Sequence, residues 1–198
     1  MLEPLIENSL VKSRFIEMFG ICLNKRQLGD ITNKITDGSH NPPKGIEKSE
    51  YLMLSSQNVF DELVLSDVRF LSKEDFDIEN KRTDIHEGDV LLTIVGTIGR
   101  THVVKSNENY TFQRSVAVIK PIKNILNGTY LSAFLKTQEA VTQLERGGHG
   151  SSQKGIYLQD VRKLLIPVPE YKKQVEFANY AQLIDKSKFI FLSLDSDM

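Results

Sequence analysis

Three side chains that could support nucleophilic or acid–base chemistry stand in one short turn: Asp37, Ser39 and His40. A hydrolytic triad of Ser, His and Asp works only when the three groups converge in space, whereas neighbours in a turn usually point apart. The simpler interpretation is a polar turn that leads into Pro42 and Pro43, since Asp, Ser and Pro all favour turns. An enzyme that uses Asp37 and His40 therefore ranks below the two functional hypotheses developed below.

Residues that bind metals are sparse and widely spaced. A single cysteine, Cys22, excludes an intrachain disulfide and fits a reducing cytoplasm. No apolar segment marks the chain for export or for a membrane. We therefore expect a cytoplasmic protein that binds no metal. The histidines stand singly, without the spacing that places two ligands on one helix face; they are His40, His86, His102 and His149.

Two glycine-containing segments resemble phosphate-binding loops at first sight. Gly96–Arg100 follows an apolar run but lacks the third glycine and the helix of a dinucleotide-binding fingerprint, so a hairpin turn is favoured. Gly147–Lys154 follows a predicted helix and lacks the Gly-Lys-Ser/Thr ending of a P-loop. Its Ser, Gln and Lys side chains can bind DNA phosphates and base edges. A solvated helix-to-strand connection explains the same composition equally well.

Two further segments carry the amide and guanidinium groups that recognise adenine and guanine edges. They are Asn80–Thr83 and Gln113-Arg114. An exposed loop is the simpler interpretation of the first segment. For Gln113-Arg114, DNA contact and a solvated strand face both remain open, because Phe112 and Val116 alternate with these polar residues.

The composition is that of an ordinary globular protein with segregated charge. The 198 residues are 40% hydrophobic and 26% charged, with a formal net charge of −1. These values argue against wholesale disorder, a membrane protein and a uniformly basic nucleic-acid coat protein. Residues 61–89 carry a net charge of −6, whereas residues 93–123 and 146–173 each carry +4. If the fold brings the two basic segments together, they form a positive face for phosphates.

Apolar periodicity predicts that helices at both ends of the chain enclose one α+β globule. Apolar residues recur at helical spacing over 2–19, over 129–146 and from 170 onward. Ser72 predicts the N-cap of a short helix. Val90–Gly96 is apolar enough to form a strand that is covered on both faces. The other predicted strands are 51–54, 58–60, 63–65, 69–71, 103–104, 115–119 and an edge strand at 164–169.

Eight segments and one glutamine occur in an order that is far more specific than any one motif. They are Lys12–Gly20, Leu28–Ile31, Ile35–Pro42, Gly88–Arg100, Phe112–Ile119, Tyr130–Leu135, Gln153–Leu158 and Ile166–Pro169, with Gln174. This order, which covers nearly the whole chain, resembles that of the specificity subunits of type I restriction-modification systems.

The resemblance implies an α+β fold. We expect one mixed α/β globular target recognition domain with short, mostly antiparallel strands, flanked by N- and C-terminal helices that pack as a spacer. The implied boundaries are 1–20 for the N-terminal helix, 21–169 for the recognition domain and 170–198 for the C-terminal spacer helix. Full-length members usually carry two recognition domains and two spacers, so this chain looks like a half-subunit, a truncated product or an isolated domain.

The function implied by the resemblance is non-catalytic recognition of one half of a bipartite DNA sequence. Methyltransferase subunits, which bind S-adenosylmethionine and methylate adenine, are the implied direct partners, and they link this chain to the ATP- and Mg²⁺-dependent restriction subunit. The expected partners are therefore double-stranded DNA and the methyltransferase and restriction subunits, with no membrane. A second copy of the chain is a further candidate partner, through the helices. The cofactors are expected in the partner subunits only.

Side-chain chemistry and the resemblance together predict a DNA-facing rim built from turns and loops. The predicted DNA-binding residues are Thr36, Asp37, Ser39, His40, Thr97, Arg100, Gln113, Arg114, Ser152, Gln153 and Lys154. The alternative hypothesis is a structural or interaction fragment of the same family, for instance a silent cassette, that no longer binds DNA. Substitution of Gln113, Arg114 and Lys154 separates the two, because it abolishes sequence-specific methylation only if the chain recognises DNA.

Overall fold

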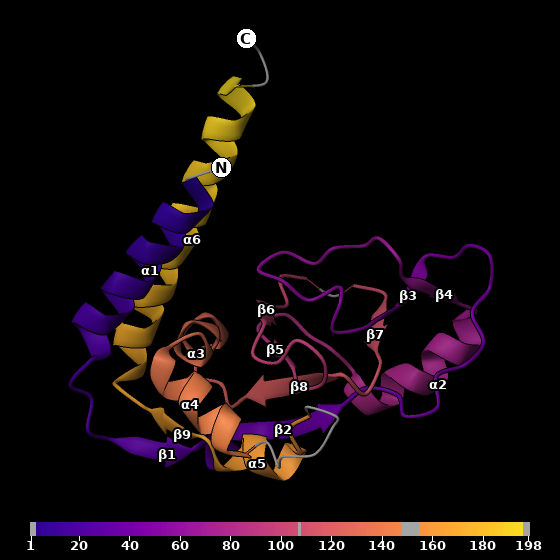
Figure 1. The fold of residues 1–198 in the computed structure, drawn as a ribbon, viewed down its shortest axis with the longest axis horizontal. Coiled ribbons are helices and arrows are strands. Elements are labelled where there is room, and N and C mark those ends of the chain that lie inside the picture. Colours follow the sequence, from indigo (N-terminus) through magenta and orange to yellow (C-terminus); the bar gives the residue numbers. More distant parts are fainter. Residues whose placement is uncertain (1–2, 107, 148–154, 196–198) are drawn as a thin grey trace.

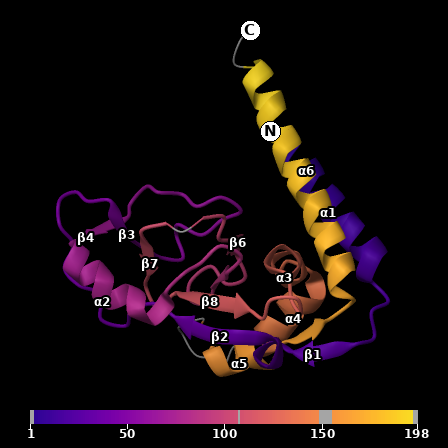
Figure 2. The ribbon, with the colours of Figure 1, turned by 180° about the vertical axis from the view of Figure 1, so that it is seen from behind.

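The computed structural model describes residues 3–106, 108–147 and 155–195, which form six α-helices and nine short strands. Figure 1 shows α1 (Glu3–Phe19) and α6 (Tyr171–Asp195) projecting as a long pair from one end of the molecule, with α2 (Lys73–Thr83) at the other end. Figure 2 shows the same arrangement from behind. The mixed architecture with short, mostly antiparallel strands confirms the predicted fold class.

The central sheet has four strands in the order β2-β8-β5-β6, and all neighbours are antiparallel. Val90 and Leu92 pack into the main core on one face of this sheet, and Leu91 packs into a second core on the other face. The prediction of a strand covered on both faces is therefore confirmed. The strands are β2 (Thr32–Asp37), β8 (Val116–Pro121), β5 (Val90–Thr93) and β6 (Thr101–Val103).

A smaller sheet lies beside the central one, with β3 antiparallel to β4 and parallel to β7. Its strands are β4 (Arg69–Leu71), β3 (Tyr51–Leu54) and β7 (Tyr110–Phe112). The predicted strands at 58–60 and 63–65 are wrong. The side chain of Asn58 binds backbone groups of this segment and holds it as a loop. The predicted cap is confirmed, because the Ser72 hydroxyl accepts from the backbone N–H of Asp75 at 3.1 Å.

The helix predicted over 129–146 is in fact two helices, α3 (Gly128–Leu135) and α4 (Gln138–Gly147). The hydroxyl of Thr137 accepts from the backbone N–H of Ala140 at 3.3 Å, and this cap starts the second helix. Downstream, α5 (Leu158–Lys163) leads to β9 (Leu165–Pro167). β9 pairs with β1 (Lys25–Gln27) in a two-stranded sheet, which agrees with the predicted edge strand.

Five buried rings join α1, α3 and α6 to the core, and we call them the aromatic cluster: Phe15, Phe19, Tyr130, Phe134 and Phe177. The ring centroids of Phe15 and Phe177 lie 5.3 Å apart and those of Phe19 and Tyr130 lie 4.9 Å apart, both edge to face. The long helices are thus docked through the main core. In the part of the chain that the structure describes, no helix is both long and apolar enough to cross a lipid bilayer.

Candidate nucleic-acid interface

Strand direction brings several turns together at one end of the central sheet. β2 and β5 end there, and their antiparallel neighbours β8 and β6 begin there. β3 and β7 end beside them, because the backbone N–H of Gln113 donates to the carbonyl of Leu54 at 2.8 Å. We call the turns 38–41, 55–58, 96–100 and 113–115 the turn cluster. Figure 1 shows β2 pointing toward this end of the sheet, close to α2 and away from β1.

Backbone hydrogen bonds join the first and last turns of the cluster. The N–H of Ser39 donates to the carbonyl of Phe112 at 2.7 Å, and the N–H of Arg114 donates to the carbonyl of Ser39 at 2.9 Å. Gly38 lies so close to this segment that a Cβ atom there would stand 1.9 Å from the Phe112 carbonyl oxygen. Only glycine permits this approach, so Gly38 fixes the distance between the two turns.

Asp37 is a buried carboxylate, 7% exposed, with a partner for each oxygen. Nε2 of His40 lies 2.7 Å from one oxygen, and the guanidinium of Arg82, from the end of α2, donates to the other. Burial raises the pKa of Asp37, but the hydrogen bonds from Arg82 and His40 outweigh it, so the pKa lies below its usual value. Asp37 therefore stays ionised at neutral pH and orients the exposed imidazole of His40.

The first turn does not assemble a hydrolytic triad. Ser39 is 6% exposed, and no hydrogen bond found among the described side chains joins its hydroxyl to His40. Thr36 is 8% exposed, with its hydroxyl 3.4 Å from the Asp37 carbonyl oxygen. Of the four residues predicted to contact DNA here, only His40 offers its side chain to solvent. Thr36, Asp37 and Ser39 shape the turn, and their burial leaves little surface for DNA.

The turn 96–100 is a hairpin between β5 and β6, as predicted. Gly96 and Gly99 have φ angles of 80° and 92°, in the region that favours glycine. The buried hydroxyl of Thr93 accepts from the N–H of Arg100 at 2.9 Å and donates to the carbonyl of Thr97. The hairpin thus presents an exposed Thr97 and a half-buried Arg100 from a fixed backbone.

The cluster presents two guanidinium groups from different turns. Arg100 lies over the ring of Phe60, with its Cζ atom 4.1 Å from the ring centroid, which is a cation–π arrangement. Arg114 is exposed, and the neighbouring Gln113 is half-buried. The structure thus brings together the predicted residues His40, Thr97, Arg100, Gln113 and Arg114.

The predicted DNA-binding residues Ser152, Gln153 and Lys154 lie outside the described residues. The described chain resumes at Gly155, which pairs with Val95 in an antiparallel bridge, while the N–H of Ile156 donates to the Ile94 carbonyl at 2.8 Å. Gly155 and Ile156 therefore lie beside Ile94 and Val95, which lead from β5 into the hairpin of the turn cluster.

Sequence reasoning missed the pairing of Arg82 with Asp37 and the turn 55–58. The segment Asn80–Thr83 was considered for DNA contact and interpreted as an exposed loop, but it forms the end of α2. Arg82 pairs with Asp37 across 45 positions, and it belongs to a segment whose dominant feature is negative charge. No local pattern indicates such a pair. The turn 55–58 had a local signal, because Ser, Ser, Gln and Asn follow an apolar run and favour turns.

Among the described residues, the cations of the two basic segments do not gather on one face. In residues 93–123, Arg100 and Arg114 lie in the turn cluster, whereas Lys105 and Lys120 lie at the opposite ends of β6 and β8. There Lys105 pairs with Glu62, and Lys120 pairs with Asp89 at 2.5 Å. In residues 146–173, Arg162 donates to the carbonyl of Ile35. The anticipated positive face is therefore replaced by a few separate cations, which Arg82 joins from the acidic segment.

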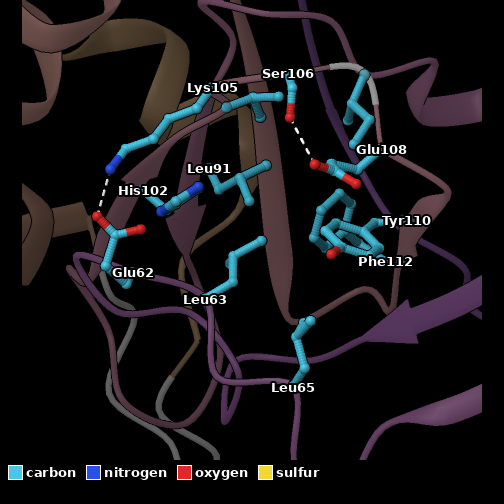
Figure 3. Close-up of a pocket in the computed structure, with 12 residues that line it drawn as sticks. Glu62, Leu63, Leu65, Leu91, His102, Lys105, Ser106, Glu108, Tyr110 and Phe112 are labelled. Atoms are coloured by element: carbon cyan, nitrogen blue, oxygen red, sulfur yellow. Dashed lines mark hydrogen bonds and ion pairs between the residues drawn. The ribbon is translucent and has the colours of Figure 1, made fainter.

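A pocket of about 330 Å³ lies against the second core. Figure 3 shows Leu63, Leu65, Leu91 and Phe112 along its apolar wall, with the pairs Lys105–Glu62 and Ser106–Glu108 at its polar rim. His102, 6% exposed, lines the pocket, and its Nδ1 atom lies 2.9 Å from the carbonyl oxygen of Asp61. Burial lowers the pKa of His102, so the imidazole is neutral at neutral pH. Since the rim groups pair with one another, this pocket adds no chemistry to the turn cluster.

Comparison with known proteins assigns this arrangement to a family. The family model described as "Type I restriction modification DNA specificity domain" matches residues 24–190. The type I restriction enzyme EcoBI specificity subunit of Escherichia coli is 31% identical over 132 residues, which cover 63% of this chain and 28% of that protein.

Solved structures show the same fold. A chain from a structural study of complex assembly and conformational transition in the type I R-M system superposes with a TM-score of 0.66 at 15% identity, covering 99% of this chain and 49% of that one. The HsdS subunit from Thermoanaerobacter tengcongensis gives a TM-score of 0.62 at 16% identity, covering 94% of this chain and 44% of that one. The chain thus spans about half the length of these structural relatives.

Proposed function

The chain belongs to the family of type I restriction modification DNA specificity domains, and from this premise we propose that it recognises one half of a bipartite DNA target through the turn cluster. In this proposal the chain carries no catalytic group. It places a methyltransferase subunit over one site, and that partner extrudes and methylates the target adenine.

The observation that supports the proposal is the convergence of polar turns on a rigid sheet end. Recognition of DNA requires side chains held in register on rigid elements, with cations close by to contact phosphates. Gly38 and Thr93 fix the backbones of two of the turns. Arg100 and Arg114 supply charge from neighbouring turns, while His40 is held by a buried carboxylate.

Charge supports a need for a partner. The formal net charge is −1, and the described residues bring few cations to the turn cluster, so the isolated chain is expected to bind DNA weakly. A methyltransferase subunit would supply the remaining contacts to the DNA backbone. S-adenosylmethionine, ATP and Mg²⁺ belong, in this proposal, to the methyltransferase and restriction subunits. A salt-resistant nanomolar complex between DNA and this chain alone would contradict it.

The long helices α1 and α6 are the proposed attachment surface for partner subunits. They keep apolar side chains in solvent, with Leu10 46%, Ile16 56% and Leu183 66% exposed. Apolar side chains on a projecting helix pair are available to pack against another chain. If two copies associate through these helices with two-fold symmetry, the recognised DNA is an inverted repeat. An asymmetric bipartite site from a homodimeric complex would contradict this conditional prediction.

Reconstitution with the cognate methyltransferase, followed by mapping of methylated adenines, tests the proposal. Gln113→Ala, Arg114→Ala and Lys154→Ala together are expected to abolish methylation at the recognised sequence and to leave the unfolding temperature unchanged. The matched control combines Gln27→Ala, Arg26→Ala and Lys123→Ala, exposed residues at the opposite end of β2 and β8, and retains methylation.

The same experiment separates the other hypotheses. Unchanged methylation in the first triple variant favours the alternative function, an interaction fragment of the family that does not read DNA. Turnover of a substrate by the purified chain, without any partner, would favour the third-ranked enzyme hypothesis.

A further inference from the structure

We propose that Gln57 reads a base edge in the DNA, and that Asn58 and Ser115 are positioning residues for its turn. This inference rests on the proposed function, and it assigns a specificity-determining residue that no pattern in the sequence singled out. The segment that carries it is the turn 55–58, between β3 and the loop that leads to β4.

The turn itself is built around the buried side chain of Asn58, which is 2% exposed. Its Oδ1 atom accepts from the N–H of Ser55 at 2.9 Å, and its Nδ2 atom donates to the carbonyls of Val64 and Ser66, both at 2.9 Å. The N–H of Asn58 also donates to the Ser55 carbonyl at 3.0 Å, which closes a four-residue turn. One amide therefore holds both ends of the surrounding loop, and Val59, which is wholly buried in the second core, anchors the turn from the apolar side.

Contacts with the neighbouring turns fix the location of this turn in the cluster. The N–H of Ser56 donates to the hydroxyl of Ser115 at 3.0 Å. A Cβ atom at Gly96 would lie 3.5 Å from the Ser56 hydroxyl, so the hairpin 96–100 also approaches Ser56. The turn 55–58 thus contacts both of the segments that supply Arg114 and Arg100.

Gln57 is the exposed central residue of this rigid turn. A glutamine amide presents a donor and an acceptor side by side, which matches N7 and the N6 amino group of adenine in the major groove. The guanidinium groups of the two neighbouring turns suit phosphates, and they fix register without reading sequence. The neutral amide of Gln57, in the turn that contacts both, is therefore suited to supply base discrimination.

The test uses the chain assembled with its cognate methyltransferase. Duplexes that bind this complex are selected from a randomised DNA pool and sequenced. Gln57→Ala is expected to remove the base preference at one position of the recovered sequence. Its affinity for the wild-type sequence falls roughly 5- to 150-fold, the range expected for loss of one bidentate pair. Gln57→Glu keeps the size but loses the donor, and it is expected to lose the same preference. Gln27→Ala, an exposed glutamine on β1, is the matched control and leaves the recovered sequence unchanged.

Ser115→Ala tests the positioning role, because it removes the acceptor of the Ser56 N–H without touching Gln57. We expect it to weaken the base preference at the same DNA position as Gln57→Ala does, with an unchanged unfolding temperature. The double variant Gln57→Ala and Ser115→Ala is expected to lose no more DNA affinity than Gln57→Ala alone, since Ser115 acts through the turn that carries Gln57. A merely structural role would weaken all positions alike and add to the Gln57 effect, which would overturn the positioning claim.

The outcomes distinguish this inference from the proposed function. If the wild-type complex recovers a defined sequence and Gln57→Ala recovers the same sequence with the same affinity, the assignment of Gln57 is wrong and the proposed function stands. If the wild-type complex recovers no defined sequence, the proposed function fails, and the assignment fails with it.

Discussion

The aromatic cluster and the turn cluster are two parts of one small domain that are held together by different forces. In the aromatic cluster, five buried rings pack edge to face or tilted across three helices. In the turn cluster, backbone hydrogen bonds, one close glycine contact and buried polar side chains set the geometry. The first resembles the interior of any globular protein, whereas the second is ordered without a large apolar contribution.

This difference separates stability from recognition. Rings that are wholly buried cannot contact a ligand, so their removal affects folding. The exposed side chains of Gln57 and Arg114 in the turn cluster contribute little to folding because their turns are held by other atoms. We therefore expect substitutions to fall into two groups, and each prediction below tests whether that division holds.

The largest stability loss is expected in the aromatic cluster. Phe177 is wholly buried, with its ring centroid 5.3 Å from that of Phe15 and 5.7 Å from that of Phe19. Phe177→Ala should lower the free energy of unfolding by about 3–5 kcal/mol, because the lost contacts and the residual cavity add together. Urea unfolding followed by circular dichroism measures this.

Leu183 lies on the same helix and is 66% exposed, so Leu183→Ala is the control. It is expected to change the free energy of unfolding by less than about 0.5 kcal/mol. A loss below about 1 kcal/mol for Phe177→Ala would mean that the aromatic cluster does not anchor α6. The proposed contrast in stability between the aromatic cluster and the turn cluster would then be wrong.

The second prediction asks whether a polar residue can be as structural as a ring. Asn58→Ala removes three side-chain hydrogen bonds to backbone groups of Ser55, Val64 and Ser66. The expected loss in unfolding free energy is about 2–3 kcal/mol, since each hydrogen bond contributes about 1 kcal/mol. Thermal unfolding measures it, and Gln57→Ala, one position earlier but exposed, is the control with an unchanged midpoint. Equal midpoints for both variants would show that the amide is not the support of this loop.

How far the sequence predicts this fold depends on the range of the interactions that decide each element. Ser72 and the apolar run Val90–Gly96 are local signals, and the structure has a cap and a doubly covered strand at these positions. The loop 58–65 shows the opposite case. Its apolar residues suggest strands, but Asn58 competes for the backbone groups of its own loop and prevents a ladder.

The candidate site shows the same limit. Strand direction is enough to place the turns together once the antiparallel order is known, so the segments containing His40, Thr97 and Gln113 converge. Burial is decided by three-dimensional packing, which is why Thr36 and Ser39 do not present their side chains although their turn was predicted. The pairing of Asp37 with Arg82, 45 positions away in the chain, is not indicated by any local sequence pattern.

The third prediction concerns the ion pair that holds the first turn. Arg82→Met leaves the buried carboxylate of Asp37 with His40 as its remaining partner. Because the Arg82 side chain is 48% exposed, the expected loss in unfolding free energy is only about 1–2 kcal/mol at neutral pH. Lys81→Met, at the adjacent exposed position, is the control and changes little.

The lowered pKa of Asp37 determines how the stability loss in Arg82→Met changes with pH. The pKa of Asp37 is lowered in the folded protein, so the pair contributes stability above the unfolded value of about 4 and loses it as the pH falls through the folded value. The difference between wild type and Arg82→Met should therefore shrink in acid unfolding below about pH 4. A difference that stays constant to pH 2 would show that Arg82 stabilises the turn by packing alone.

The smallest stability effect, and the sharpest contrast, is expected at Arg114. Its side chain is exposed and its backbone N–H, which donates to the Ser39 carbonyl at 2.9 Å, is retained in Arg114→Ala. The free energy of unfolding should change by less than about 0.5 kcal/mol. In complex with the methyltransferase, by contrast, loss of one phosphate contact should reduce the slope of log affinity against log salt by about 0.9. Fluorescence anisotropy at salt concentrations from about 50 to 200 mM measures that slope. If Arg114→Ala instead lowers stability and leaves the salt slope intact, the turn cluster contains structural residues like the aromatic cluster, and the division between the two regions does not exist.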